Sequence, residues 1–550
     1  MTTFGAVARR GGGWLPVIGA AGLLDAVATL ALPAVFGRGV DAIVTDGDTE
    51  RWLVLAAGLI ALSVACDLVY AFATAACEAG TTAWLRTRLV QHVLAVGHQG
   101  SRRFDTGDLV SRVSGNAVEA AQAGPSVLAV GTVLLLPVGS LVMLAYIDLW
   151  LAVAFLAGLA LVAVVLRAFT RRTAEVITSY QETQGRIAGR LAESLAGART
   201  IAAAGTVEQE ERRVLEPLPD LHDQGMRTWR VLSRSTAQAA VVGPLVLVAV
   251  IAAGGIELVN GRISPGDLFA ASQYAVLGAG LGGLTNVFGR LARARAGVRR
   301  TGEVLAVDPV THGGRALPDG PGRLEFHAVT ARAGDATLLD GVDLALPGGA
   351  TVAVVGRSGA GKSVLAALAA RLREPDEGQV LLDGIPLGEL SHAALRTGVG
   401  CAFERPVLVG STVADAIGLG LDPDRVRAAA RATHAHEFVT RLPHGYDTPL
   451  ADAPMSGGEA QRLGLARAWH AERLLVLDDA TSSLDMVTEM QISRTVTDDG
   501  GGGRTRLVVT HRAATAARAD LVVWLENGRL RAVGPHHELW DEPAYQEVFG

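Results

Sequence analysis

A glycine-rich loop with the spacing of a phosphate-binding site begins at Gly356. The apolar run Thr351–Val355 is typical of a buried strand, and it leads through GRSGAGKSV into an apolar helix over Leu365–Leu372. Glycines let backbone N–H groups turn toward phosphate oxygens, and the helix N-terminus adds its positive end. We expect Lys362 to reach the β- and γ-phosphates and the Ser363 hydroxyl to ligate Mg²⁺. The candidate nucleotide-binding residues are Gly356, Arg357, Ser358, Gly359, Ala360, Gly361, Lys362, Ser363 and Val364.

Two further apolar runs end in residues that suit the same chemistry. Leu474–Leu477 precedes Asp478, whose carboxylate suits Mg²⁺, and Asp479, which could orient or deprotonate an attacking water. The run Arg506–Val509 ends close to His511, which could contact the γ-phosphate. Such a histidine alone would be an ordinary surface residue, but its order after the other two motifs favours a functional role.

The segment Met455–Trp469 reads MSGGEAQRLGLARAW and predicts another helix with a glycine-rich start. The loop at Gly356 already has its own helix N-terminus, so this second one is expected to serve another nucleotide. Helix N-termini bind anions through free N–H groups and the helix dipole. The candidate anion-binding residues here are Ser456, Gly457, Gly458 and Glu459.

The order of strands, loops and helices around these motifs predicts an α/β P-loop ATPase domain over residues 323–550. A Pro- and Gly-rich stretch, Asp308–Gly322, has no apolar period and marks the start of this domain. We therefore divide the chain into a first domain over residues 1–305, a linker over residues 306–322 and the ATPase domain.

The first domain is predicted to be an α-helical membrane bundle with six transmembrane helices. The chain of 550 residues is 49% hydrophobic with a mean hydropathy of +0.32, which indicates a membrane part joined to a soluble part. Six apolar runs come close to the ~20 residues with which a helix crosses ~30 Å of hydrocarbon. They are Trp14–Phe36, Leu53–Ala76, Ser126–Ile147, Trp150–Leu166, Ala239–Leu258 and Phe269–Phe288.

Arginines indicate how this bundle is oriented. They are frequent before the first run, between the second and third, between the fourth and fifth, and after the sixth, whereas the opposite loops are short and poor in Arg. By the positive-inside rule, both termini and the ATPase domain should be cytoplasmic, as in a multi-pass plasma-membrane protein. The two long cytoplasmic segments carry Arg and Glu at helical spacing and predict long helical extensions of the spans.

Four acidic residues lie in or near the spans. Because an ionisable group in lipid is costly, Asp67, and after it Asp25, are candidates for lining a substrate path. Glu78 and Glu257 lie near span ends, where they could be in water. The neighbouring thiols of Cys66 and Cys77 are expected to be small packing groups rather than a redox pair.

Composition excludes several classes of protein. Residues 301–550 hold 33 acidic and 23 basic groups, so this half lacks the basic surface that a nucleic-acid partner needs. Three Cys exclude a disulfide scaffold, and the large apolar fraction argues against disorder. Lys362 is the only lysine among 49 basic residues, so the phosphate loop is the one place where a compact ammonium is kept.

In this order the motifs resemble those of the ATP-binding cassette (ABC) transporters, and the whole chain resembles an exporter half-transporter. The resemblance implies that two halves sandwich two ATP molecules with Mg²⁺, each ATP lying between Walker A of one half and the signature of the other. Its partners would be a second half-transporter, the lipid bilayer and a transported small molecule or peptide. The motifs are Walker A at Gly356–Ser363, the signature at Met455–Glu459, Walker B at Leu474–Asp478, the D-loop at Ser483–Asp485 and the switch histidine at His511.

Two segments of the membrane domain resemble the intracellular segments of such exporters. FDTGDLVSR (Phe104–Arg112) contains one expected coupling helix. LAESLAGARTIAAAG (Leu191–Gly205) follows the other, which we place near Tyr180–Gly189. Because the first span begins at Trp14, we expect no N-terminal peptidase domain and no leader-cleaving export by this chain.

The chain departs from the family pattern around ATP. Asp479 replaces the catalytic Glu, its carboxylate sits ~1.5 Å back, and misplacement on this scale can cost ~10²-fold in rate. Glu404 replaces the Q-loop Gln, and we count it with the catalytic and Mg²⁺-binding residues. Ala333 stands where an aromatic stacks on adenine, a contact worth ~1–3 kcal/mol in other nucleotide sites. Asp452 replaces a Glu before the signature, and Glu459 replaces a Gln within it.

This pattern resembles the impaired half of heterodimeric exporters. It implies a slow ATP site in this chain and a signature that completes the site of a different partner chain. A non-hydrolysing regulatory half, in which ATP is only a clamp, and a homodimeric exporter with modest activity are the alternatives. An importer fits less well because importers usually keep the two domains on separate chains, and six spans exclude a soluble P-loop kinase. Peptides, natural products, lipids and drugs all remain open as substrates.

Overall fold

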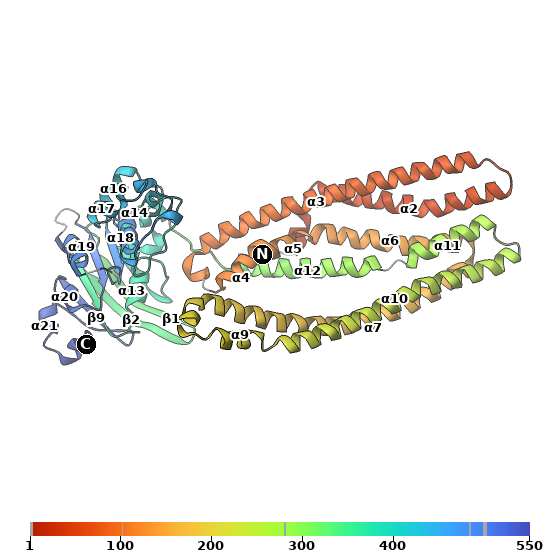
Figure 1. The fold of residues 1–550 in the computed structure, drawn as a ribbon. Coiled ribbons are helices and arrows are strands. Elements are labelled where there is room, and N and C mark those ends of the chain that lie inside the picture. Colours follow the sequence, from red (N-terminus) through yellow and green to blue (C-terminus); the bar gives the residue numbers. More distant parts are fainter. Residues whose placement is uncertain (1–3, 102, 280–281, 483, 485, 499–502) are drawn as a thin grey trace. The chain divides into compact units, whose positions relative to one another are not determined.

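The chain folds into two compact units in the computed structural model, which describes residues 4–101, 103–279, 282–482, 484, 486–498 and 503–550 (Figure 1). The helical unit comprises Met1–His92 and Thr106–Val307. The sheet unit comprises Val93–Asp105 and Asp308–Gly550. Each unit is described by itself below.

Long helices build the helical unit. In chain order the elements are α1 (Phe4–Arg9), α2 (Trp14–Val44), α3 (Thr49–Ser101), α4 (Thr106–Ser111), the π-helix η1 (Arg112–Asn116), α5 (Ala117–Ala121), α6 (Ala123–Ile147), α7 (Leu149–Ala196), α8 (Ala198–Ala204), α9 (Val207–Leu215), α10 (Leu218–Val259), α11 (Pro265–Ala279) and α12 (Gly282–Leu305). Gly97 breaks the regular geometry of α3 with φ 70°. Asp148 begins α7 as its N-cap, accepting a hydrogen bond from the Trp150 N–H.

Several of these helices are longer than a membrane is thick. With 48 and 42 residues, α7 and α10 are about 70 and 60 Å long at ~1.5 Å per residue. A hydrocarbon core of ~30 Å takes up about half of either length or less. The long helical extensions that the sequence predicts are therefore present.

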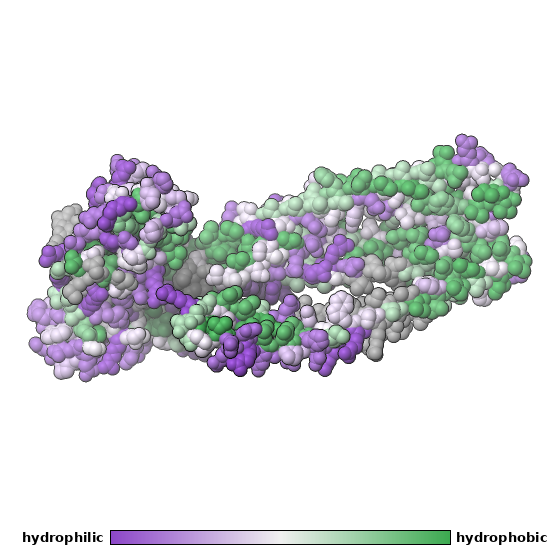
Figure 2. All heavy atoms as spheres, viewed as in Figure 1, coloured by the Kyte–Doolittle hydropathy of each residue, from purple (hydrophilic) through white to green (hydrophobic). Residues whose placement is uncertain are grey.

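Apolar stretches of membrane-spanning character recur along the helical unit. Within the described residues, three are long and apolar enough to cross a membrane, Trp14–Val44, Thr49–Gly97 and Thr106–Ile147, and two shorter apolar stretches cover Leu149–Ala160 and Gly243–Val259. The sixth predicted run is divided between α11 and α12 by residues 280–281, which lie outside the described part of the chain. Figure 2 shows hydrophobic side chains gathered over α2, α11 and the adjoining ends of α3 and α10.

The expected coupling helix near Tyr180–Gly189 is wrong. These residues continue the regular turns of α7, which ends only at Ala196. The chain reverses instead through the short helices α8 and α9, between Gly197 and Pro217. Uninterrupted helical spacing up to Ala196 leaves no reason for the chain to turn earlier, whereas Gly205 ends α8 in the left-handed conformation that favours glycine.

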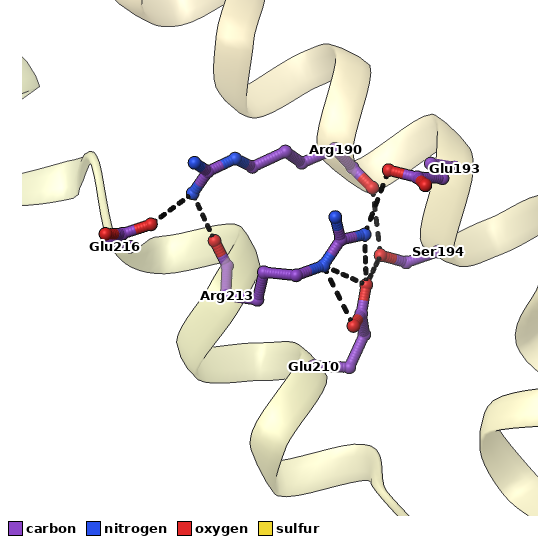
Figure 3. Close-up of polar contacts among 6 residues, drawn as sticks. All are labelled: Arg190, Glu193, Ser194, Glu210, Arg213 and Glu216. Carbon is purple, nitrogen blue, oxygen red and sulfur yellow. Dashed lines mark hydrogen bonds and ion pairs between the residues drawn. The ribbon is translucent and has the colours of Figure 1, made fainter.

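A polar network fastens α9 to the end of α7 (Figure 3). The guanidinium of Arg213 donates to both carboxylate oxygens of Glu210 and to Glu193, at 2.6–3.0 Å. The Ser194 hydroxyl donates to Glu210 at 2.5 Å. Arg190 closes the network, donating to the Arg213 carbonyl at 2.5 Å and to Glu216 at 2.8 Å. The turn at this end of the helical unit is thus tied across two helices.

Two sheets make up the core of the sheet unit. The strands are β1 (Leu324–Ala333), β2 (Ala336–Leu346), β3 (Thr351–Val355), β4 (Glu377–Leu382), β5 (Ile385–Pro386), β6 (Val399–Phe403), β7 (Leu474–Asp478), β8 (Thr505–Val509), β9 (Leu521–Glu526) and β10 (Arg529–Gly534). The antiparallel sheet has the order β2-β1-β4-β5, and the larger sheet has the order β10-β9-β3-β8-β7-β6. In the larger sheet only the pairing of β10 with β9 is antiparallel.

Short helices complete the sheet unit. They are α13 (Lys362–Ala369), α14 (His392–Gly398), α15 (Val413–Gly418), α16 (Pro423–Ala432), α17 (His436–Val439), α18 (Gly457–Ala468), α19 (Met486–Asp498), α20 (Ala513–Ala516), α21 (His536–Leu539) and α22 (Pro543–Gln546). All five residues of β3 are buried. Because β3, β8, β7 and β6 run parallel, their carboxyl ends meet at one edge, where open α/β sheets bind ligands.

Candidate active site

The loop after β3 forms a backbone cradle around the lysine. Gly356, Gly359 and Gly361 have φ of 154°, 83° and 99°, which residues with side chains rarely adopt. Lys362 begins α13 and is 6% exposed, with its Nζ donating to the carbonyls of Gly356 at 2.8 Å and Arg357 at 3.1 Å. Burial lowers the pKa of Lys362, while the nearby carboxylates of Asp479 and Asp478 act in the opposite direction. The predicted loop is therefore formed with its ammonium group inside it.

A hydroxyl and a carboxylate meet beside this cradle. The Ser363 Oγ on α13 donates to Asp478 Oδ1, at the end of β7, over 3.0 Å. Burial raises the pKa of Asp478, and the hydrogen bond from Ser363 partly opposes this shift. Mg²⁺ prefers such hard oxygen ligands, commonly one or two from protein with the rest from phosphates and water. These two oxygens therefore suit the Mg²⁺ role that the sequence predicts for them.

Asp479 follows at a special backbone position. Its φ is 48°, and its N–H donates to the carbonyl of Val509 on β8 at 3.3 Å. Its Oδ2 lies 3.4 Å from Nε2 of His511. Burial raises the pKa of Asp479, opposed by His511 and Lys362 and reinforced by Glu404. The structure thus brings together the two residues predicted to handle the attacking water and the γ-phosphate.

Glu404 adds a further carboxylate to this edge. It follows Phe403, which pairs with Asp478 across β6 and β7. Its side chain is 56% exposed, with Arg405 Nε 3.9 Å from Oε1. Its negative charge raises the pKa of both Asp478 and Asp479. A glutamine at this position would lack that charge, so the substitution makes the site more acidic.

Gln461 is a site residue that sequence reasoning missed. It lies on α18, is 2% exposed, and donates from Nε2 to the Glu404 carbonyl at 2.7 Å and to Ser482 Oγ at 3.2 Å. It therefore links the signature helix to the loop after β6 and to the segment after β7. A polar residue among the buried positions of α18 was the signal that could have identified it.

The signature residues form a capping box at the start of α18. The Ser456 hydroxyl accepts a hydrogen bond from the Glu459 N–H at 3.3 Å, and the Glu459 carboxylate accepts from the Ser456 N–H at 2.8 Å. The Ser456 hydroxyl also donates to this carboxylate at 2.9 Å. The hydrogen bond from the Ser456 N–H lowers the pKa of Glu459. The negative charge of Glu459 is thus held at the helix N-terminus, near Gly457 and Gly458.

The other departures lie on exposed positions. Ala333 ends β1, and Asp452 ends the short 3-10 turn η4 (Leu450–Asp452), with both residues exposed. Of the predicted D-loop, Ser483 and Asp485 lie outside the described residues. The structure therefore describes the phosphate and metal side of the site in more detail than the D-loop.

The acidic residues of the spans differ in their surroundings. Asp25 on α2 accepts a hydrogen bond from Ser63 on α3 at 2.5 Å, and Asp67 is exposed. Glu257, expected in water, is instead 6% exposed and pairs with Arg262 at 3.0 Å. Cys66 and Cys77 are buried free thiols, as a packing role predicts.

Comparison with known proteins places these observations in a family. Residues 15–278 match the model of the ABC transporter transmembrane region, and residues 339–482 match that of the ABC transporter. The chain is 48% identical over 530 residues to the "ABC transporter ATP-binding protein RamA" of Streptomyces coelicolor, covering 96% of this chain and 83% of that protein. It is 31% identical to an "ATP-dependent lipid A-core flippase" of Chromohalobacter salexigens, covering 83% and 80%.

A solved structure shows the same fold. The "Structure of a bacterial Atm1-family ABC exporter with ATP bound" aligns with a TM-score of 0.81 over 99% of this chain and 98% of that one, at 23% identity. This likeness extends through both the helical unit and the sheet unit.

Proposed function

Because this chain belongs to the ABC transporter family, as an exporter half-transporter, we propose that it is the slow half of a two-chain exporter. As a family member it is an ATPase subunit that couples hydrolysis to transport and works as a dimer in a lipid bilayer. The proposal adds that its own site binds MgATP but turns it over slowly, and that its signature completes the site of a different partner chain.

One observation carries the proposal. The groups that would hold the nucleotide are in place, because Lys362 lies inside the glycine-rich loop and the Ser363 hydroxyl is hydrogen-bonded to Asp478. The carboxylate that would activate water is carried by the shorter side chain of an aspartate, Asp479. Asp479 stands where the family has Glu, so its carboxylate sits ~1.5 Å further back from an attacking water, and misplacement on this scale can cost ~10²-fold in rate. Binding without fast turnover follows from this combination.

Each residue then has a defined task. The N–H groups of the loop from Gly356 and the ammonium of Lys362 would bind the phosphates, while Ser363 and Asp478 would hold Mg²⁺. Bound Mg²⁺ supplies positive charge against the phosphate oxygens. Asp479 would accept the proton of the attacking water, and His511 would contact the γ-phosphate.

The signature would serve the partner's ATP. Ser456, Gly457 and Gly458 open α18, whose N-terminus offers N–H groups to an anion. Glu459 keeps its charge there through the capping box, where the family's usual Gln would be neutral. We infer that this signature remains usable but binds the partner's phosphate less tightly than a Gln-bearing one.

A regulatory half is the second candidate. Glu404 places a further negative charge beside Asp478 and Asp479, and Ala333 offers no ring for adenine. With these two features the site would hold ATP mainly by its phosphates without hydrolysing it, so ATP would act as a clamp rather than as fuel. A homodimeric exporter with modest activity is the third candidate.

The domain boundaries, the membrane orientation and the substrate class in this proposal are taken from the sequence. We propose a membrane domain over residues 1–305, a linker over 306–322 and an ATPase domain over 323–550, with both termini and the ATPase domain cytoplasmic at the plasma membrane. The substrate would be a peptide, natural product, lipid or drug-like molecule. The flippase name of one relative favours a lipid-like molecule among these.

Purification separates a two-chain exporter from a homodimeric one. The chain would be expressed alone and together with half-transporters that carry the catalytic Glu, and each product would be assayed for subunit composition and ATPase rate. The proposal expects a mixed dimer whose ATPase rate exceeds that of this chain alone. A stable homodimer with robust transport-coupled ATPase would overturn it.

A further inference from the structure

A small basic cavity in the sheet unit shares no residue with the candidate active site. It measures about 150 Å³ and lies between the linker residue Val310, the end of α3 at Leu94–Gly97, and the residues after α13. All of its lining belongs to the sheet unit. The polar side chains that line it are His312, Arg371, Arg373, Glu374, His392 and Arg396.

Arg371 lines this cavity and is held in place by hydrogen bonds. It is 7% exposed and has φ 48°. Its guanidinium donates to the Thr311 carbonyl at 2.6 Å and to Glu374 at 2.8 Å, and it lies 2.9 Å from Nδ1 of His312. Glu374 is the only carboxylate in the lining, and it is already engaged with Arg371.

Two more arginines contribute charge without matching carboxylates in the lining. Arg396 donates to the Ala370 carbonyl at 3.1 Å and has no ion pair with any described residue. Burial, and next the neighbouring Arg371, lower the pKa of Arg396. Arg373 donates to the Arg332 carbonyl and lies 3.9 Å from Asp376, which is outside the lining, while its Nε is buried with no hydrogen-bond partner among the described residues. The cavity therefore has an excess of positive charge and an unused donor.

The two histidines pack edge to face against each other. The rings of His312 and His392 are 4.9 Å apart. Burial, followed by the charge of Arg371, lowers the pKa of His312, so this ring is neutral near pH 7. The arginines therefore contribute more of the cavity's positive charge than His312 does.

We propose that this cavity binds a small oxyanion of the phosphate class. A partly buried cation such as Arg396, which has no ion pair among the described residues, is costly, and an anion removes that cost. Arginine guanidinium groups match phosphate oxygens in geometry as well as charge. The volume lies well below the ~300–1,000 Å³ of pockets for drug-sized ligands and holds about five waters at ~30 Å³ each, which suits a single phosphate group.

An anion in this position would join separate segments. It would contact α14 through Arg396 and His392 and the segment after α13 through Arg373, beside the linker at Val310. Ligands that bind only the folded state stabilise it. The phosphate group could be free in solution or part of an anionic lipid headgroup, and these sources can be separated by experiment.

Binding of labelled inorganic phosphate to the purified chain in detergent tests the proposal. Arg396→Gln is expected to weaken phosphate binding at one site roughly 10–100-fold, the effect of losing a charge-assisted hydrogen bond. The matched control is Arg427→Gln, an exposed arginine on α16 that pairs with Asp424, and it should leave binding unchanged. Phosphate that binds in the glycine-rich ATP-binding loop contributes equally in both variants, so it does not affect the difference between them.

A second variant covers the case in which Arg396→Gln folds poorly. His392 is exposed in the first turn of α14, where an acidic residue is favourable, so His392→Glu should fold while placing a negative charge at the cavity. We expect it to reduce the phosphate-dependent rise in Tm below that of the wild type and to raise the Tm without phosphate, because the new carboxylate supplies the negative charge that phosphate would supply.

Vesicles distinguish the source of the anion. Reconstitution would compare pure phosphatidylcholine with phosphatidylcholine containing phosphatidylglycerol, without free phosphate. Stabilisation by phosphate in detergent that Arg396→Gln weakens supports a soluble oxyanion, and such stabilisation only by phosphatidylglycerol supports a headgroup. Equal responses of the wild type, Arg396→Gln and His392→Glu to both probes would overturn the proposal.

Discussion

Lengthening the side chain of Asp479 by one methylene should accelerate ATP hydrolysis. Asp479 directly follows the last residue of β7 and is one methylene shorter than the Glu that the family has at this position. A glutamate extends the carboxylate by ~1.5 Å, and positioning at the 1 Å level is worth about 10²-fold in rate. We therefore expect kcat to rise roughly 10–100-fold in Asp479→Glu, a barrier lower by about 1.4–2.7 kcal/mol.

The assay is phosphate release at saturating MgATP by the purified chain, with and without a partner half. Asp479→Asn is the matched control, because it keeps the size of the side chain, removes the base and should abolish hydrolysis. Asp479 has φ 48°, which aspartate tolerates better than glutamate, so the Tm of both variants must be compared with that of the wild type. An Asp479→Glu protein that folds normally and hydrolyses ATP no faster would refute the reasoning and favour the regulatory half.

Other substitutions test separate parts of the account. Glu404→Gln removes a charge that raises the pKa of Asp479, so the acid limb of the ATPase pH profile should move to lower pH, and an unmoved limb would remove Glu404 from the site. Lys362→Arg places a planar guanidinium group in a loop that encloses a buried ammonium group. MgATP should therefore bind roughly 10–100-fold more weakly, as measured by equilibrium dialysis. Arg213→Gln unties α9 from Glu193 and Glu210, so transport in vesicles should fall more than ATPase, and an equal fall would argue against a coupling role.

The raised carboxylate pKa values also predict how stability depends on pH. Asp478 and Asp479 hold protons more tightly in the folded protein than in the unfolded chain. Their contribution is therefore complete below the unfolded value of ~3.9 and is lost as pH rises through the raised folded values. Thermal scans without nucleotide should show this loss, and Asp478→Asn should reduce it.

Local signals predicted most of the phosphate side of the site. The loop at Gly356 is formed by its own glycines, by the apolar strand before it and by the Lys-Ser pair that follows. These residues are adjacent in the chain, so the structure of the loop could be predicted from their order in the sequence. The meeting of Ser363 with Asp478 needed one additional inference, that the two strands run parallel and end at one edge. That inference follows from the alternation of strands and helices.

Features that depend on distant contacts were missed or misplaced. Gln461 joins the site only because α18 packs against the loop after β6, which no local pattern encodes. The expected coupling helix was placed inside α7, because α7 keeps its helical spacing through Tyr180–Gly189 and gives no sign of where the chain turns. The bond between Asp25 and Ser63 likewise joins residues 38 positions apart on two helices.

The fate of ATP bound to this chain tests the central claim most directly. Purified wild-type chain would be mixed with labelled MgATP, and the bound nucleotide would be separated and identified over time. The account predicts that ATP stays bound largely intact, far longer than the ~0.1 s that a typical turnover of ~10 s⁻¹ allows, and that Lys362→Ala retains none. Conversion to ADP at such a typical rate by the wild-type chain alone would contradict it.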